Sequence, residues 1–213
     1  QLSKLLLKKE MPEDSNYWLK KALNTYPGSI EAWMEKMIRS YDTSRWDELA
    51  ANFKKGLTKV NSNLRFILLE GLIQHLVQSK SRDELFLPVI NKKAADRLIK
   101  TINKQPPDIL LYYYGAWLLI QLRETENANK WLNKCQELDP EFWPARLEAL
   151  SLCADNQPLD TEFKEHLDFF FNRARQIKKF ICSRCGLKRE KLFFVCPRCR
   201  SWHSISFQMS LNQ

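Results

Sequence analysis

The residues with the clearest chemistry in this sequence are four cysteines near its C-terminal end. Cys182, Cys185, Cys196 and Cys199 form two Cys-x-x-Cys pairs with ten residues between them. Each pair places two sulfur atoms on one side of a tight turn, and a hairpin brings the two pairs together. Four thiolates complete a tetrahedron around one ion and leave no open position, so the pattern predicts a closed, structural metal site.

Zinc is the metal that we expect in this site, and iron bound by four cysteines is the redox alternative. Disulfides are the other use of clustered cysteines, but they belong to secreted proteins, and no secretory signal is visible. A module of about 35 residues cannot bury enough apolar surface to fold alone, and metal binding supplies on the order of 10 kcal/mol.

The remaining candidates for chemistry are weaker. His75 and His166 lie in predicted helices, where packing or solvation explains them, and core packing explains Cys135. His203 follows Trp202 beside the cysteines, but four sulfurs already complete the metal shell. The sequence has no glycine-rich phosphate loop, no Ser/His/Asp order and no evident carboxylate pair. We therefore expect a protein that is not an enzyme.

The composition predicts that helices position these cysteines. Only five of the 213 residues are glycine, whereas a β-barrel or sandwich needs many tight turns. The contents of apolar residues (44%) and aromatic residues (12%) are those of a globular protein. The longest uncharged apolar stretch, 109–120, is shorter than the roughly 20 residues that span a bilayer.

A spacing of 34 residues recurs along the chain, with an 11-residue slip that we place around 78–91. The pairs at this spacing include Pro27 and Asn61, Ala22 and Gly56, Ala94 and Ala128, and Pro106 and Pro140. This period is typical of tetratricopeptide repeats, in which small residues let neighbouring helices approach closely and a proline ends the second helix. The alternative is an irregular helical bundle.

The predicted helices cover residues 13–26, 29–42, 45–59, 63–79, 83–104, 107–122, 126–138, 141–154 and 160–178, and 2–9 looks like a remnant of another. Asp108 and Asp160 are the expected N-caps. The last helix carries an aromatic and apolar stripe, expected to be core, of Phe163, Leu167, Phe170 and Phe171. After it, the runs 180–181, 193–195 and 205–207 are prone to form strands.

Charge separates the two parts of the chain. Residues 173–200 hold ten basic residues and one acid, whereas residues 1–172 sum to zero. The basic part could contact phosphates of nucleic acid or anionic lipid headgroups. Three aromatic residues lie in or beside this part, namely Phe193, Phe194 and Trp202. They would stack on bases in a nucleic-acid-binding module, or else form the module's small core.

The cysteine motif also resembles a known family. Residues 180–186 read Phe-Ile-Cys-Ser-Arg-Cys-Gly, and residues 194–203 read Phe-Val-Cys-Pro-Arg-Cys-Arg-Ser-Trp-His. With the repeats before them, they resemble the lipopolysaccharide assembly protein B family, which joins tetratricopeptide repeats to a rubredoxin-like ribbon; the ribbon alone also resembles that of the RadA repair protein. The resemblance implies a mainly α fold. A tetratricopeptide-like helical repeat solenoid with a capping helix would cover residues 1–178, and a rubredoxin-like zinc ribbon would cover 179–213.

The function implied by the resemblance is that of a protein-binding scaffold or adaptor. Members of the family regulate lipopolysaccharide synthesis at the cytoplasmic face of the bacterial inner membrane. They promote degradation of the deacetylase LpxC by the membrane protease FtsH, and they carry an N-terminal membrane anchor. No anchor is visible here, so we expect either a truncated chain, from which the anchor has been removed, or a shorter relative of the family. No partner-binding residue can be carried over to the repeats, and a homodimer is compatible with the sequence. The alternative is a nucleic-acid-binding protein that uses the basic ribbon.

We also expect the ribbon to dock on the C-terminal repeats, because the helix over 160–178 runs into Phe180 without a flexible linker. The aromatic residues just before it would provide an apolar seat, namely Phe163, Phe170 and Phe171.

Overall fold

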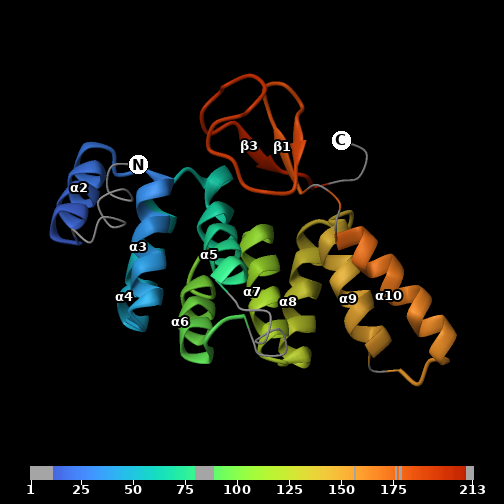
Figure 1. The fold of residues 1–213 in the computed structure, drawn as a ribbon. Helices are drawn as coiled ribbons and strands as arrows, with labels where there is room; N and C mark the ends of the chain where they lie inside the picture. Colours follow the sequence, from blue (N-terminus) through green and yellow to red (C-terminus); the bar gives the residue numbers. More distant parts are fainter. Residues whose placement is uncertain (1–11, 80–88, 156, 176, 178, 210–213) are drawn as a thin grey trace.

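The computed structural model describes residues 12–79, 89–155, 157–175, 177 and 179–209. In these ranges, nine α-helices precede a small three-stranded sheet (Figure 1). The helices are α2 (Pro12–Thr25), α3 (Ile30–Asp42), α4 (Trp46–Lys59), α5 (Phe66–Ser79), α6 (Lys92–Ile102), α7 (Ile109–Gln121), α8 (Thr125–Leu138), α9 (Trp143–Asp155) and α10 (Thr161–Arg175). A short 3-10 helix, η1 (Ser62–Leu64), precedes α5. The fold is therefore mainly helical, as predicted.

One predicted helix, over 83–104, begins too early. The observed α6 begins at Lys92 because the Asn91 side chain accepts a hydrogen bond of 2.9 Å from the Lys93 N–H and caps the helix. Residues 83–88 and the helix predicted over 2–9 lie outside the described residues. Asp108 caps α7 as predicted, since its Oδ1 accepts two backbone hydrogen bonds of 3.0 Å.

The helices stand side by side in chain order from α2 to α10 (Figure 1). Helix α3 packs on α4 and α5, α4 packs on α6, and α7 packs on α5, α6 and α8. Two glycines permit close approach, because a Cβ at Gly71 would overlap Met34 and one at Gly115 would overlap Trp131. The small-residue expectation is wrong at Ala22, which is exposed because its side of α2 faces solvent.

A buried carboxylate links α5 to α7. The Tyr114 hydroxyl donates to Glu70 Oε2 at 2.7 Å, and Gln74 Nε2 donates to Glu70 Oε1 at 2.7 Å. Burial raises the pKa of Tyr114 well above its ordinary value, and the charge and hydrogen bond of Glu70 raise it further. The link is therefore strongest while Tyr114 keeps its proton.

Helix α10 is attached to α9 by charge as well as by packing. Arg175 on α10 donates two hydrogen bonds to Glu148 on α9, from Nε to Oε1 at 3.2 Å and from Nη2 to Oε2 at 2.9 Å. The expectation that its whole aromatic stripe is core is wrong, since Phe163 and Phe170 are 54% and 65% exposed and Phe171 is buried. One face of α10 packs on α9, and the other residues of the stripe project beyond that contact.

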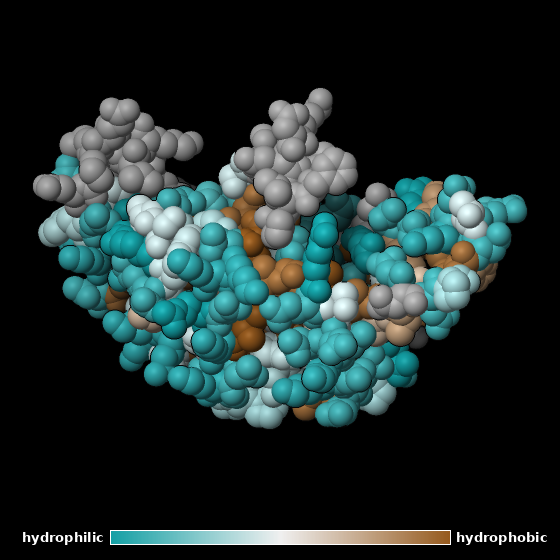
Figure 2. Space-filling view, turned by 90° about the horizontal axis from the view of Figure 1, so that it is seen from below, coloured by the Kyte–Doolittle hydropathy of each residue, from teal (hydrophilic) through white to brown (hydrophobic). Residues whose placement is uncertain are grey.

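The C-terminal sheet consists of β1 (Phe180–Cys182), β2 (Lys188–Arg189) and β3 (Ile205–Phe207) in the order β2-β1-β3, with both pairings antiparallel. Phe180 lies opposite Phe207 in this register. The strand predicted over 193–195 is wrong, because Val195 forms only an isolated bridge with Trp202. The division of the chain into two domains at residue 179 stays a prediction. Strand β1 begins one residue after this boundary. Figure 2 shows the side of the molecule that lies opposite to this sheet. That side is mostly hydrophilic and has a narrow apolar band.

Candidate metal centre

The four predicted metal ligands lie together in the C-terminal part of the chain, residues 179–209, which is called the ribbon below. The Sγ atoms of Cys182, Cys185, Cys196 and Cys199 are all within 4.8 Å of one another. The distance from Cys182 to Cys199 is 3.7 Å, and that from Cys185 to Cys196 is 3.6 Å. Sulfur atoms bound tetrahedrally to zinc at about 2.3 Å lie about 3.8 Å apart. The four side chains can therefore hold one metal ion.

Both cysteine pairs are shaped by the same backbone turn. The Gly186 N–H donates to the Cys182 carbonyl at 2.8 Å, and the Arg200 N–H donates to the Cys196 carbonyl at 2.8 Å. Gly186 and Arg200 both have positive φ, 67° and 57°, and each stands four residues after the first cysteine of its pair. The repeated geometry directs both pairs of sulfurs to one centre.

Hydrogen-bond donors around two of the four sulfurs, those of Cys182 and Cys199, favour the thiolate form that a metal requires. Burial opposes ionisation of Cys182, but the Ser204 hydroxyl at 3.2 Å and backbone N–H groups of the turn outweigh it and lower the pKa to about 6. The Ser201 side chain and N–H lower the pKa of Cys199 in the same way. Such donors orient the sulfurs and stabilise their negative charge.

The ribbon rests on the helices through a cluster of aromatic rings. Phe180 stacks on Phe66 with ring centroids 6.1 Å apart and 13° between the ring planes. Phe207 lies 5.9–6.1 Å from three rings of the helical part, those of Phe66, Tyr113 and Phe142. The expectation of docking is thus confirmed, but the predicted seat on α10 is wrong. Pairing of β1 with β3 joins Phe180 and Phe207 into one apolar face, which meets α5, α7 and the start of α9.

A polar contact holds the ribbon to α3 as well. His203 Nε2 lies 2.9 Å from Glu31 Oε1, so this histidine contacts a helix and is not one of the four clustered ligands. Phe193 and Phe194 are partly buried against the same core, whereas Trp202 remains 63% exposed. The ribbon therefore uses most of its aromatic residues for packing and leaves one on its outer surface.

The other sequence candidates stay separate from the cysteines. His75 Nε2 contacts Asp42 Oδ1 at 3.0 Å, and His166 is exposed on α10. Cys135 is fully buried, which raises the pKa of its thiol to about 12 and accounts for it as a core residue. Throughout the described ranges, no other group of three or more His, Cys, Asp or Glu side chains is placed to hold a metal.

A basic groove along α4 and α6 was not predicted from the sequence. Its signal was present, because Lys93, Arg97, Lys100 and Lys104 follow the spacing that puts side chains on one face of a helix. None of the helices in the described part of the chain is both long enough and apolar enough to cross a membrane. No family model matches the chain, and no curated protein matches it either.

Proposed function

We propose that this chain is a non-enzymatic protein-binding adaptor, a tetratricopeptide-like solenoid that carries a zinc ribbon in a fixed position. The observation that carries the proposal is the shared aromatic core of the ribbon and the helices, centred on Phe207 and Phe66. A ribbon packed in this way cannot turn independently of the helices. Together they offer a partner one extended surface of constant shape, which is how helical repeat proteins bind.

Two recurring features support the assignment of repeats. Helices α7 and α9 begin 34 residues apart, at Ile109 and Trp143. Trp33 Nε1 donates to the Pro27 carbonyl at 2.8 Å, and Arg146 Nε donates to the Pro140 carbonyl. In both cases the donor stands six residues after the proline that begins the unit, so two distant parts of the chain close their turns in the same way.

Zinc is the metal in this proposal, because a closed set of four thiolates is its usual structural site. Elemental analysis of protein purified without chelator should give about one equivalent of zinc per chain. Iron in its place would give a red protein with visible charge-transfer bands and would favour an electron-transfer role.

The partners that follow from the family resemblance are FtsH and LpxC, at the cytoplasmic face of a bacterial inner membrane. The test is to mix purified FtsH in detergent with LpxC and to measure LpxC degradation with and without this chain. The chain should accelerate degradation, and the variant Phe207→Ala, which removes the ribbon's main anchor, should accelerate it less. Unchanged degradation, together with no complex of the chain with either protein on size exclusion, would contradict the proposal.

The ribbon's outer surface favours a second candidate, a nucleic-acid-binding protein. Trp202 is exposed there, and so are Arg198 and Arg200. An exposed aromatic ring among arginines can stack on a base and contact phosphates. Titrations with RNA, with DNA and with anionic lipid vesicles at increasing salt would distinguish this function, because phosphate contacts weaken steeply with salt. Nucleic-acid binding that is lost in Trp202→Ala would favour it over the adaptor.

A further inference from the structure

A groove of three adjoining hollows crosses α2, α4 and α6 on the helical part. The central hollow has a volume of about 740 Å³, and hollows of about 260 Å³ adjoin it on either side. Arg45 and Glu48 line the central hollow and the one toward α2, whereas Asp47, Arg97 and Lys100 line the central hollow and the one toward the end of α6. The shared residues make the three hollows one continuous surface.

Positive charge is in excess along this groove. Three of its basic residues lie along one face of α6, namely Lys93, Arg97 and Lys100, and Lys104 follows just after the end of this helix. The other four are Lys20 on α2, Lys36 on α3, Lys54 on α4 and Arg45, the residue just before α4. Of its three acids, Asp47 pairs with Arg97 at 3.0 Å and Glu48 pairs with Arg45 at 2.7 Å. The lysines of α6 in this groove are all exposed and form no ion pair with any described residue.

Lys36 lies at the end of the groove toward α2 and is partly buried. Burial lowers the pKa of Lys36; Glu48 opposes this shift, and the nearby Lys55 and Lys20 add to it. The hollow at this end is lined by Lys20, Lys36 and Arg45 against one acid, Glu48, so an added carboxylate here would be attracted.

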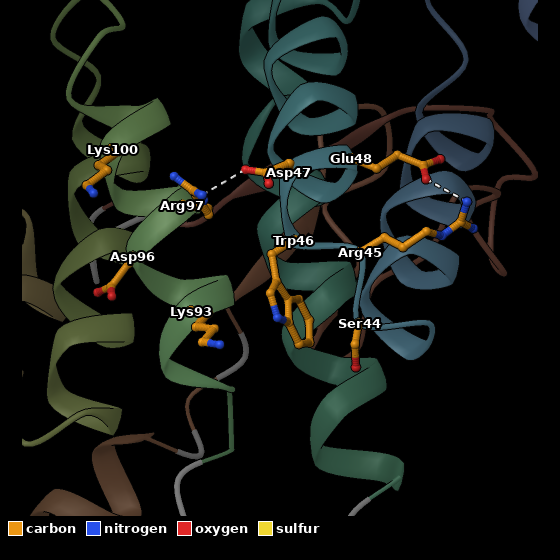
Figure 3. A pocket seen from close by; sticks show the side chains of 9 residues that line it. All are labelled: Ser44, Arg45, Trp46, Asp47, Glu48, Lys93, Asp96, Arg97 and Lys100. Carbon is orange, nitrogen blue, oxygen red and sulfur yellow. Dashed lines mark ion pairs between the residues drawn. The ribbon is translucent and has the colours of Figure 1, made fainter.

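The residues that line the groove suit contact with a helix. Figure 3 shows Arg97 and Lys93 of α6 extending toward Asp47 and Trp46 at the central hollow. Trp46 is half-buried and packs edge-on against Tyr41 at 5.3 Å, which leaves part of its ring for an apolar contact. Further along, Ala50 and Ala51 line the groove and allow close approach of another backbone.

We propose that the groove between α4 and α6 binds an acidic amphipathic helix of a partner protein. The basic residues of α6 stand at i, i+4 and i+7, which corresponds to rises of about 6 and 4.5 Å along the axis. A partner helix with glutamates at the same spacing would lie alongside α6 and match each charge. The carboxylates of Asp47, Glu48 and Asp96 would repel a continuous row of phosphates, whereas a peptide can offer basic residues to them. This proposal rests on the proposed function, because it gives the adaptor one class of partner.

The test uses the full chain and a fluorescent alanine-rich peptide with Glu at i, i+4 and i+7. Binding is measured by the fluorescence anisotropy of the peptide. A matched peptide with Gln at these positions should bind much more weakly. The variant Lys93→Gln/Lys100→Gln should weaken binding of the Glu peptide by up to about fivefold for each exposed charge removed. The control Lys130→Gln/Lys164→Gln removes the same charge from exposed sites on α8 and α10 and should bind like the unchanged chain.

Three outcomes would overturn the proposal: equal binding of the Glu and Gln peptides, equal loss in the two double variants, or displacement of the peptide by a single-stranded oligonucleotide of the same charge at lower concentration. Binding of FtsH and LpxC is measured separately with the same variants. If the unchanged chain binds the Glu peptide through Lys93 and Lys100 but binds neither FtsH nor LpxC, the groove assignment stands and the family-derived partners do not.

Discussion

Phe66 and Phe180 stack with their ring planes only 13° apart, although one begins α5 and the other begins β1. This contact belongs to a cluster in which Phe207 contacts rings from both parts of the molecule. The attachment of the ribbon is therefore chiefly aromatic, and its strength can be measured by removing one ring at a time.

The first prediction concerns the ring with the most neighbours. Phe207→Ala should lower the free energy of unfolding by about 3–5 kcal/mol, because it leaves a cavity among four other rings. Phe170→Ala, on the exposed side of α10, is the control and should change stability by about 0.5 kcal/mol or less. Denaturant unfolding measures both. Backbone NMR relaxation of Phe207→Ala should show ribbon motion faster than that of the helices, and similar stability losses in both variants would refute the aromatic anchor.

A second prediction separates the metal from the helices. Cys182→Ser removes one of the four sulfurs, so the ribbon should lose its metal and its fold, since the module has little apolar core of its own. The far-ultraviolet circular dichroism of the helices should change little, because most of the core lies between helices. The control Cys153→Ser changes an exposed cysteine outside the ribbon and should keep one equivalent of metal. Helices that melt together with the ribbon would show that the metal supports the whole fold.

The cysteine site could be predicted from the sequence because its geometry is local. Two short turns fix all four sulfurs, and Gly186 even marks the positive φ of the first turn. The seat of the ribbon could not be predicted, because Phe66 opens an apolar run that reads as ordinary helix core. Nothing near it in the sequence indicates that its ring faces a strand so far along the chain. The late start of α6 was missed for a similar reason, since the cap at Asn91 was less visible than the apolar pattern around it.

The third prediction uses alkaline pH. Burial raises the pKa of both Tyr113 and Tyr114, and the charge of Glu70 adds to the shift. Their neutral forms are favoured by folding, so this stabilisation is complete below the ordinary tyrosine pKa of about 10 and falls as pH rises above it. In an ultraviolet titration, two of the six tyrosines should ionise only as the protein unfolds. Tyr114→Phe should leave one such late tyrosine, and ionisation of all six in a single early step would contradict the burial.

A fourth prediction compares the polar contact with the aromatic one. Glu31 and His203 are both partly exposed, so their coupling in a double-mutant cycle should be about 1 kcal/mol or less. The cycle uses Glu31→Gln, His203→Gln and the double variant. Denaturant unfolding measures the free energy of unfolding of each. A coupling as large as the loss in Phe207→Ala would mean that the charged contact, not the rings, attaches the ribbon.

The contact of His203 with Glu31 joins residues 172 positions apart, and the aromatic cluster spans a similar range. A ribosome makes the helices first, at about 5–20 residues per second, so Phe66 emerges several seconds or more before Phe207. During that interval no strand covers the rings of Phe66, Tyr113 and Phe142. A nascent chain would therefore expose an aromatic patch that is prone to non-specific association. Chains that stop before β3 would keep this patch, which would mark them for chaperones or proteases as unfinished.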